Sequence, residues 1–239
     1  MDSKKNKKNK KMKAVILLSG GIDSATCIAL AVNELGKENV LALCFRYGQK
    51  HEVELLYAER IAKHYGVKMV DFDLSNVYET STSCLIASSG VEVDKGTYSE
   101  VAEKSVSMIS SYIPFRNGVM ISVATAIALS EFPNCNIKVY IGNHQDDNCY
   151  PDCSKDFVDG MDAALFHGSG NLVRLVSPFV SKTKAEIVAL GLSLGIPYEM
   201  TYSCYNGRTE HCGTCPSCRT RREAFEVNNK SDQVKYEVI

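Results

Sequence analysis

Short apolar runs alternate with amphipathic segments along this chain. The segments between the runs repeat their apolar residues at helical spacing, and the runs themselves are typical of buried strands. This alternation favours an α/β fold with a doubly wound parallel sheet. The predicted strands are Ala14–Leu18, Val40–Phe45, Lys68–Asp73, Ile137–Gly142 and Val173–Val176.

Helices are predicted where the apolar period and an end signal coincide. Gly66 and Gly195 are placed to end two of them, and Ser154 is placed to cap a third. The stretch Ser75–Ile113 has no clean period, so we expect a functional flap or a partly disordered segment there. The predicted helices follow Ser24 and cover Glu52–Tyr65, Gly118–Glu131, Ser154–His167 and Lys184–Leu194.

Three polar segments follow predicted strands directly. They are Ser19–Ser24, Arg46–His51 and Asn143–Asp152. Right-handed crossovers bring the carboxyl ends of parallel strands to one edge of the sheet, and ligands bind at that edge. We therefore expect the three segments to face one crevice.

The segment Ser19-Gly-Gly-Ile-Asp-Ser24 joins the first predicted strand to the first predicted helix. Backbone N–H groups and the positive end of the helix dipole converge there, which favours a phosphate. The two glycines permit positive φ and close approach, and Ser19 and Ser24 add hydroxyl groups. Asp23 repels phosphate unless a divalent cation lies between them, and Mg²⁺ prefers such oxygen ligands. The common loops G-x-x-x-x-G-K-[ST] and G-x-G-x-x-G are both absent.

Length and charge limit the other possibilities. The 239 residues are 45% hydrophobic, which is enough for one large domain and a small appendage. Residues 1–13 carry a net +6, which leaves −7 for 14–239 because the whole chain carries −1. The net negative charge of residues 14–239 therefore argues against a nucleic-acid-binding surface there. Without a signal sequence or a transmembrane run, we expect a cytoplasmic protein.

Four cysteines near the C-terminus have the spacing of a metal site. Cys212, Cys215 and Cys218 form two consecutive C-x-x-C steps, and Cys204 lies eight residues upstream. Four thiolates suit a closed, tetrahedral, structural Zn²⁺ site. An iron–sulfur cluster is the alternative, because C-x-x-C-x-x-C also serves such clusters.

The other cysteines have no such spacing. We expect Cys27, Cys44, Cys84 and Cys135 to be packing or loop residues. Cys149 and Cys153 flank Tyr150-Pro-Asp152. Cys153 is also a candidate nucleophile, although the sequence names no base to activate it.

The motif Ser19–Ser24 resembles the S-G-G-x-D-S loop of the ATP pyrophosphatase superfamily, which has the fold of the adenine nucleotide alpha hydrolases. Over residues 13–225, further motifs resemble the 7-cyano-7-deazaguanine synthases of queuosine biosynthesis. These motifs are Pro114-Phe-Arg-Asn117, Tyr150-Pro-Asp-Cys153, Lys184-Ala-Glu-Ile187 and Ser203-Cys-Tyr-Asn-Gly207 followed by the cysteine steps. The family has an acidic residue before Y-P-D-C, and here Asp146 and Asp147 both qualify.

The resemblance implies an ATP-dependent carbon–nitrogen ligase with Mg²⁺ and Zn²⁺. It would convert 7-carboxy-7-deazaguanine and ammonia to the 7-cyano base, releasing AMP and pyrophosphate. Adenylation turns the carboxylate oxygen into a leaving group, and ammonia then gives an amide. A second adenylation, on the amide oxygen, permits loss of AMP to form the nitrile.

The resemblance also implies roles for individual residues. Asp23, Lys184 and Arg116 are the candidate catalytic residues, with Asp23 on Mg²⁺, Lys184 on the phosphates and Arg116 on the substrate carboxylate or phosphates. Arg116, Asn117, Tyr150 and Asp152 are the candidate base-binding residues, and a helix-cap role is the alternative for Asn117 and Asp152. His144 is either a proton carrier or polar surface. The candidate nucleotide-binding residues are Leu18, Ser19, Gly20, Gly21, Ile22, Asp23, Ser24, Ala25, Thr26, Cys27 and Ile28, and the candidate zinc ligands are Cys204, Cys212, Cys215 and Cys218.

The expected organisation is a Lys-rich disordered tail (1–12), a nucleotide-binding domain (13–200), a zinc-binding segment (201–228) and a second tail (229–239). We expect a homodimer that acts on small molecules and binds neither membrane nor nucleic acid. Three other classes stay open. They are an enzyme that stops at the amide or uses another amine, a tRNA-thiolating enzyme, and a nucleotide-sensing zinc-ribbon module without turnover.

Overall fold

The computed structural model describes residues 10–106, 108–147 and 149–237. Most of the predicted disordered tail, residues 1–9, lies outside these ranges. Met12, which we assigned to the tail, already belongs to the first strand.

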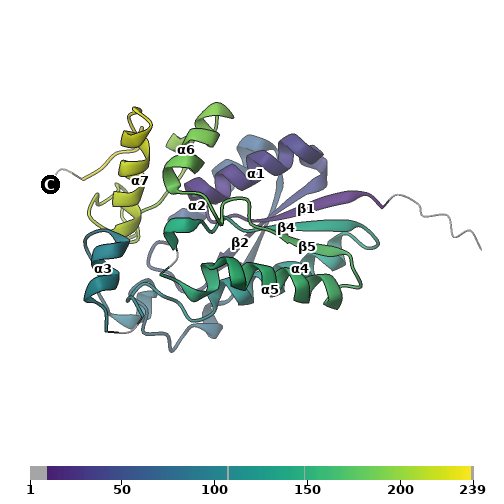
Figure 1. The fold of residues 1–239 in the computed structure, drawn as a ribbon, viewed down its shortest axis with the longest axis horizontal. Coiled ribbons are helices and arrows are strands. Elements are labelled where there is room, and N and C mark those ends of the chain that lie inside the picture. Colours follow the sequence, from purple (N-terminus) through teal and green to yellow (C-terminus); the bar gives the residue numbers. More distant parts are fainter. Residues whose placement is uncertain (1–9, 107, 148, 238–239) are drawn as a thin grey trace, which may run out of the picture.

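One five-stranded sheet forms the centre of the molecule (Figure 1). Its order is β3-β2-β1-β4-β5, and all neighbouring strands are parallel. The prediction of a doubly wound parallel sheet is therefore confirmed, and β3 and β5 have the predicted bounds. The strands are β1 (Met12–Leu17), β2 (Val40–Arg46), β3 (Lys68–Asp73), β4 (Asn136–Tyr140) and β5 (Val173–Val176).

Helices cover both faces of the sheet. In Figure 1, α1, α2 and α6 lie above the sheet and α4 and α5 below it. The five predicted helices are all present, and the four that were given bounds begin and end within two residues of them. The helices are α1 (Ile22–Leu35), α2 (Glu54–Tyr65), α3 (Tyr98–Lys104), α4 (Arg116–Glu131), α5 (Lys155–Gly168), α6 (Lys184–Ser193) and α7 (Pro216–Val227). Short 3-10 turns cover Lys37–Asn39, Ser75–Val77, Ala87–Ser89, Gln145–Asp147, Pro151–Cys153 and Tyr198–Met200.

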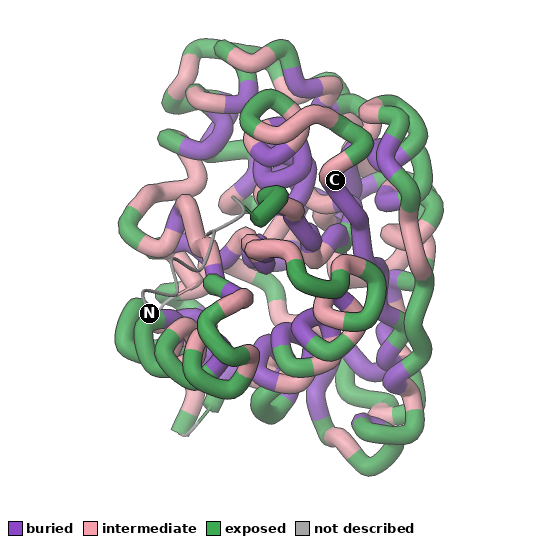
Figure 2. Tube along the Cα trace, turned by 90° about the vertical axis from the view of Figure 1, so that its right-hand side faces the viewer, coloured by how far each residue is buried: buried purple, intermediate pink, exposed green. Residues whose placement is uncertain are grey.

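The three central strands, β1, β2 and β4, bury side chains on both faces of the sheet, as expected between two helical layers, whereas the edge strand β3 is largely exposed. Ala14 and Ile16 of β1 pack with α1, α2 and α6, whereas Val15 packs with α4 and α5. Figure 2 shows the buried stretches running through the interior, with exposed turns around them. Because successive side chains point to opposite faces and both faces are buried, the central strands are continuous apolar runs in the sequence.

Two segments have more regular structure than we predicted. The flap at 75–113 contains α3, whose first turn has a capping box formed by Thr97 and Glu100. The predicted zinc-binding segment, residues 201–228, is called the cysteine segment below. It continues into α7, which begins at Pro216 directly after Cys215. The N–H of Gly96 donates to the carbonyl of Thr214, so the flap is fastened to the cysteine segment.

In the described ranges, none of the helices combines the length and the apolarity that crossing a membrane requires.

Candidate active site

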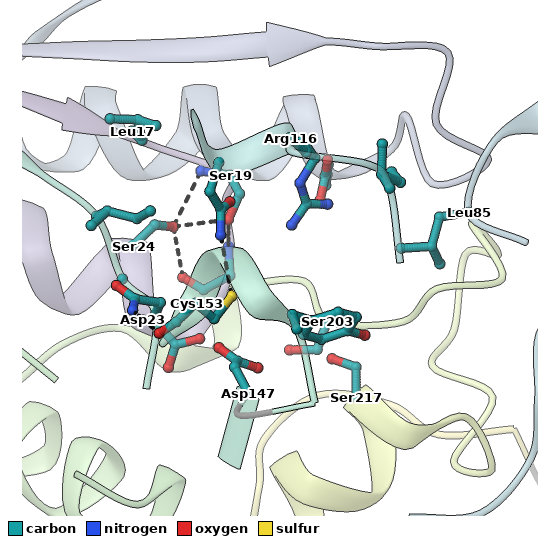
Figure 3. Close-up of a pocket in the computed structure, with 18 of the residues that line it drawn as sticks. Leu17, Ser19, Asp23, Ser24, Leu85, Arg116, Asp147, Cys153, Ser203 and Ser217 are labelled. Carbon is teal, nitrogen blue, oxygen red and sulfur yellow. Dashed lines mark hydrogen bonds between the residues drawn. The ribbon is translucent and has the colours of Figure 1, made fainter. Parts of the chain in front are cut away.

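The segment Ser19–Ser24, called the phosphate turn below, forms a tight turn at the N-terminus of α1. Gly20 has φ of +80°, and Gly21 is the N-cap of α1 with no side chain to satisfy the first N–H groups. The hydroxyls of Ser19 and Ser24 lie 3.2 Å apart, and Ser24 donates to the carbonyl of Gly21 (Figure 3). The free N–H groups and the two hydroxyls make this turn suitable for an anion.

Two glycines let other elements approach the turn closely. A Cβ on Gly20 would lie 2.6 Å from the carbonyl oxygen of Glu54, at the start of α2. A Cβ on Gly142 would lie 2.9 Å from the Cβ of Asp23. The segments after β2 and β4 are thereby brought to the phosphate turn, as we predicted from the strand ends.

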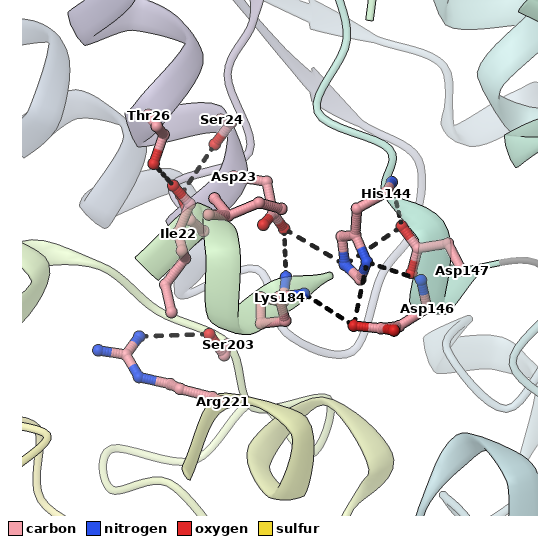
Figure 4. Close-up of polar contacts among 12 residues, drawn as sticks. Ile22, Asp23, Ser24, Thr26, His144, Asp146, Asp147, Lys184, Ser203 and Arg221 are labelled. Carbon is pink, nitrogen blue, oxygen red and sulfur yellow. Dashed lines mark hydrogen bonds and ion pairs between the residues drawn. The ribbon is translucent and has the colours of Figure 1, made fainter. Parts of the chain in front are cut away.

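Lys184 reaches the turn from the start of α6. Its Nζ lies 2.5 Å from Oδ2 of Asp23 (Figure 4). The other oxygen of Asp23, Oδ1, is buried and has no hydrogen-bond partner within the described ranges. Asp23 thus keeps one carboxylate oxygen available for a hard cation such as Mg²⁺, whose preferred ligands are oxygens.

His144 lies in the loop after β4 and is buried, so of the two alternatives for this residue the polar-surface one is wrong. Its Nδ1 accepts from the N–H of Asp146, which leaves the proton of the neutral ring on Nε2. Nε2 lies 3.4 Å from Asp147 and 3.9 Å from Asp23. His144 therefore connects the two carboxylates and donates toward them.

Asp146 and Asp147 have different surroundings. Oδ2 of Asp146 accepts from the N–H of Lys184 and so holds the start of α6. Asp147 faces the cavity, and burial raises the pKa of its carboxyl. Of the two carboxylates that fitted the family pattern, Asp147 is the one that lines the site.

Arg116 is the first residue of α4 and lines the same cavity as the phosphate turn. Its guanidinium lies over the ring of Tyr47, 5.4 Å from the centroid, and donates to the Tyr47 hydroxyl over 3.3 Å. Among the described residues its hydrogen bond goes to this phenol, not to a carboxylate. A partly buried guanidinium whose hydrogen bond goes to a neutral phenol favours an anionic ligand.

Asn117 and Asp152 hold each other. The backbone N–H of Asn117 donates to Oδ2 of Asp152 over 2.9 Å, so Asp152 caps α4. The side-chain Nδ2 of Asn117 donates to the carbonyl of Asp152 and contacts Sγ of Cys153. Burial raises the pKa of the Cys153 thiol, which disfavours the thiolate that a nucleophile needs.

Aromatic side chains close the rest of the cavity. Tyr150 stacks on Tyr112 with an interplanar angle of 26°, and its hydroxyl bonds to Ser111 over 2.7 Å. Tyr98 of the flap bonds through its hydroxyl to that of Tyr205 over 2.6 Å. The flap and the segment after Cys204 thus meet at the cavity wall.

The four predicted ligand cysteines come together. Their Sγ atoms all lie within 4.8 Å of one another, and those of Cys212 and Cys218 are 4.0 Å apart. A zinc tetrahedron with Zn–S bonds of ~2.3 Å has edges of about 3.8 Å, so the donor set fits Zn²⁺. The sulfurs are buried, and a shell of four thiolates leaves no position for a substrate.

A buried ion pair holds the cysteine segment in place. Arg221 of α7 is 1% exposed and pairs with Asp232 over 2.7 Å. It also donates to Thr201 and to the carbonyl of Tyr198. The segment contributes Tyr202, Ser203, Tyr205, Ser217 and Thr220 to the cavity wall.

The structure brings together most of the predicted site residues. The cavity is lined by Leu18, Ser19, Gly21, Ile22, Asp23, Ser24, Arg116, Asn117, Tyr150, Asp152 and Lys184. Ala25, Thr26, Cys27 and Ile28 are buried within α1 and do not line it, and Gly20 packs against α2. Arg46 points outward and pairs with Asp71, so only part of the Arg46–His51 segment faces the crevice.

Apart from tyrosines, the histidine and the glutamate that follow β2 line the cavity without having been among the predicted site residues. His51 and Glu54 follow β2 and lie on the first turn leading into α2, with Nε2 of His51 3.5 Å from the carboxylate. The signal was present, since polar residues three positions apart after a buried strand share one face at a helix start.

The fold and site define an α/β enzyme of nucleotide-binding type, with a phosphate turn after β1 and a four-cysteine segment over the cavity. The model of the family described as "Queuosine biosynthesis protein QueC" matches residues 13–229, and the chain belongs to this family. The resemblance inferred from the motifs is therefore confirmed.

Curated relatives agree with this assignment. A 7-cyano-7-deazaguanine synthase from Pseudoalteromonas atlantica is 40% identical over 226 residues, which are 94% of this chain and 99% of the relative. One from Archaeoglobus fulgidus is 39% identical over 223 residues, 92% of this chain and 89% of the relative. Among solved structures, an NMN synthetase from Francisella tularensis overlaps with a TM-score of 0.47 at 16% identity, covering 93% of this chain and 79% of that one, a likeness too weak to carry an argument.

Proposed function

We propose that this enzyme converts 7-carboxy-7-deazaguanine and ammonia to 7-cyano-7-deazaguanine, with ATP cleaved to AMP and pyrophosphate. One observation supports this most strongly. An anion-binding turn, a lysine and an arginine line a single cavity, and the lysine, Lys184, is paired with Asp23 of the turn. That arrangement suits an enzyme that must hold a triphosphate and a carboxylate at once. The names of the relatives supply the product, 7-cyano-7-deazaguanine, and the resemblance described above supplies the carboxylate substrate.

The first step under this proposal is adenylation. The substrate carboxylate attacks the α-phosphorus, and the bond to the bridging oxygen breaks, so that pyrophosphate leaves. The N–H groups at the start of α1, with the hydroxyls of Ser19 and Ser24, hold the leaving oxygens. Lys184 balances the charge that builds up there, as a point charge held by Asp23.

Arg116 holds the carboxylate of the base while it attacks. Tyr150 offers a ring face to the planar base, and Asp152 offers a carboxylate to its N–H groups. Both amide donations of Asn117 go to neighbouring protein atoms, so we assign it the task of fixing Asp152 rather than reading the base.

Ammonia then attacks the acyl-adenylate to give the amide, and the amide oxygen is adenylated in turn. Loss of AMP from this second intermediate leaves the nitrile. Both adenylations use the same phosphate turn, so the base must keep its place between them. The hydrogen-bonded tyrosines that the flap and the cysteine segment contribute to the cavity wall are suited to retain it.

The proposal includes two metals. Asp23, through its unpartnered Oδ1, and Asp147 would hold Mg²⁺, which would supply charge stabilisation to the phosphates. Cys204, Cys212, Cys215 and Cys218 would hold Zn²⁺ and pin the cavity wall formed by residues 201–228. The domain bounds given above, with the first tail shortened to residues 1–11, a cytoplasmic location and a homodimer complete the proposal. Light scattering tests the homodimer.

The deciding experiment is incubation with 7-carboxy-7-deazaguanine, ammonium chloride, Mg²⁺ and ATP, followed by mass spectrometry. The 7-cyano base with two AMP per turnover supports the proposal. The amide as end product, with one AMP, would assign an enzyme that stops halfway. ADP as product, or AMP formation independent of the base, would overturn the adenylation mechanism.

A further inference from the structure

A group of polar side chains on the β2–α2 segment is not used by the mechanism above. Gln49 and His51 are almost fully buried, at 1% and 4% exposure, and the Glu54 side chain is 12% exposed. His51, Glu54 and Tyr47 line the same cavity as the phosphate turn. Burying an ionisable pair is costly, so an arrangement of this kind calls for a reason.

Hydrogen bonds fix the carboxylate of Glu54. Gln49 donates to Oε1 over 3.1 Å, and its own oxygen accepts from the N–H of Tyr47. Nε2 of His51 lies 3.5 Å from Oε2 of Glu54 and 3.3 Å from the Tyr47 hydroxyl. The Tyr47 hydroxyl in turn accepts a hydrogen bond from Arg116. A connected polar chain therefore runs from the arginine to the carboxylate.

The group lies between the phosphate turn and Arg116. The backbone of Glu54 is so close to Gly20 that a Cβ there would be 2.6 Å from its carbonyl oxygen. On the other side, Gly207 packs on the backbone of Lys50 and His51, and the ring of Tyr205 lies 5.7 Å from that of His51. Glu54 is thus held beside the place where an acyl-adenylate would form, and is shielded from bulk water.

One ring nitrogen of His51 lacks a hydrogen-bond partner among the described residues. Its Nδ1 is buried and has no hydrogen-bond partner anywhere in the ranges that the structure describes. A ring whose Nε2–H faces Glu54 and Tyr47 has a lone pair on Nδ1. A buried acceptor without a protein partner is explained best by a small donor ligand.

We propose that Glu54, supported by His51, binds ammonium and takes its proton, so that ammonia is released beside the adenylated carboxylate. This inference rests on the proposed function. The Glu54 carboxylate accepts one proton from ammonium, giving neutral ammonia and a carboxylic acid. The nitrogen lone pair forms the C–N bond, and the C–O bond to AMP breaks. AMP leaves with that electron pair, and the surplus N–H proton passes to its phosphate.

The environment of the pair fits this task. Burial raises the pKa of Glu54 to about 8, against the opposing effects of Gln49 and Arg116. A carboxyl of this basicity is a far better acceptor of an ammonium proton than an exposed one. Burial, with the charge of Arg116, lowers the pKa of His51 to about 3, so His51 stays neutral and does not repel the cation. The titratable and charged groups around Glu54 are Cys44, Tyr47, His51, Arg116 and Tyr205.

The test uses E54Q, which keeps the shape and loses the base, with E52Q as a matched control on an exposed neighbour. Wild-type enzyme is first shown to make base-dependent AMP, because failure at this point would concern the proposed function alone. With ammonium as nucleophile at pH 7, we expect kcat/KM for E54Q to fall about 100-fold or more and E52Q to be unchanged.

Hydroxylamine distinguishes proton removal from a structural role, because it is largely unprotonated at neutral pH. With hydroxylamine as nucleophile, the rate of E54Q should return to within a few-fold of wild type. Above pH 8 the ammonium-dependent rate of wild type should level off, while that of E54Q keeps rising with free ammonia. Equal loss with both nucleophiles, or no loss with either, would overturn the inference. H51Q, which keeps a neutral polar group, should show the same nucleophile dependence with a smaller loss.

Discussion

Nζ of Lys184 lies 2.5 Å from Oδ2 of Asp23, which joins the first turn of α6 to the first turn of α1 across 161 positions of sequence. Both helix starts are fixed independently. Thr183 and Glu186 form a capping box on α6, and Gly142 packs against Asp23 at α1. The ion pair therefore holds the Lys184 ammonium group beside the phosphate turn.

Replacing Lys184 by Met should remove adenylation while leaving the fold intact. The capping box of α6 does not use the lysine side chain, so the helix should keep its start. The loss of a fixed charge next to the leaving pyrophosphate should lower kcat for base-dependent AMP formation about 100- to 1000-fold. Lys182→Met changes a neighbouring lysine outside the cavity and is the control. Equal activity of the two variants would contradict the role of Lys184.

Gly142→Ala tests the close contact between the loop after β4 and α1. The added methyl would lie 2.9 Å from the Cβ of Asp23, and one of the two segments must move. We expect about 1–3 kcal/mol of lost stability from overpacking and a fall in adenylation of at least ~10-fold. Urea unfolding and AMP release measure the two effects.

Gly160→Ala is the matched control for that substitution. Gly160 is an exposed position within α5, and a Cβ there meets nothing within 4 Å. Removing a helix-interior glycine should stabilise the protein by about 0.5–1 kcal/mol and leave activity unchanged. Destabilisation by both variants would show that the contact at Asp23 is not the cause.

Metal removal should open the cavity wall. Metal analysis of the purified protein should give about one zinc per chain, and iron with visible absorbance would overturn the zinc assignment. Cys215→Ser should abolish metal binding and cost on the order of several kcal/mol of stability. Because Tyr202, Ser203 and Tyr205 lie on the affected segment, base binding should weaken as well. Cys135→Ser, outside the cluster, should keep the metal.

The sequence predicted those features that depend on neighbours along the chain. The central strands β1 and β2 appear as apolar runs because both faces of the sheet are buried there. Ser154 caps α5 with its own hydroxyl, which accepts from the N–H of Phe157. The phosphate turn is likewise a local device. It needs two glycines and the start of one helix, and all of these lie within six residues.

Features that depend on distant partners could not be predicted in this way. Helix α7 contains many charged residues, and Arg221 is buried only because Asp232 and Thr201 meet it there. Polar surface was one of two alternatives for His144, yet the side chain is buried in a loop that follows the close approach of Gly142 to α1. The choice between Asp146 and Asp147 also required the fold, because α6 supplies the partner of Asp146 from 38 residues away.

Glu54→Gln should make the protein more stable, and increasingly so as the pH rises. The pKa of Glu54 is raised from 4.5 to about 8 by burial, so the folded state holds a proton that the unfolded chain loses above pH 4.5. Stability therefore falls between pH 4.5 and 8 in the wild type, and glutamine removes this dependence. The stability difference between E54Q and wild type should grow from near zero at pH 4.5 to a few kcal/mol, with ~4–5 kcal/mol as the upper limit, at pH 8.5. Urea unfolding at pH 4.5, 6.5 and 8.5 measures it, with the exposed E52Q as control. A difference that stays constant with pH would show that Glu54 has an ordinary pKa and is no better a base than a surface carboxylate.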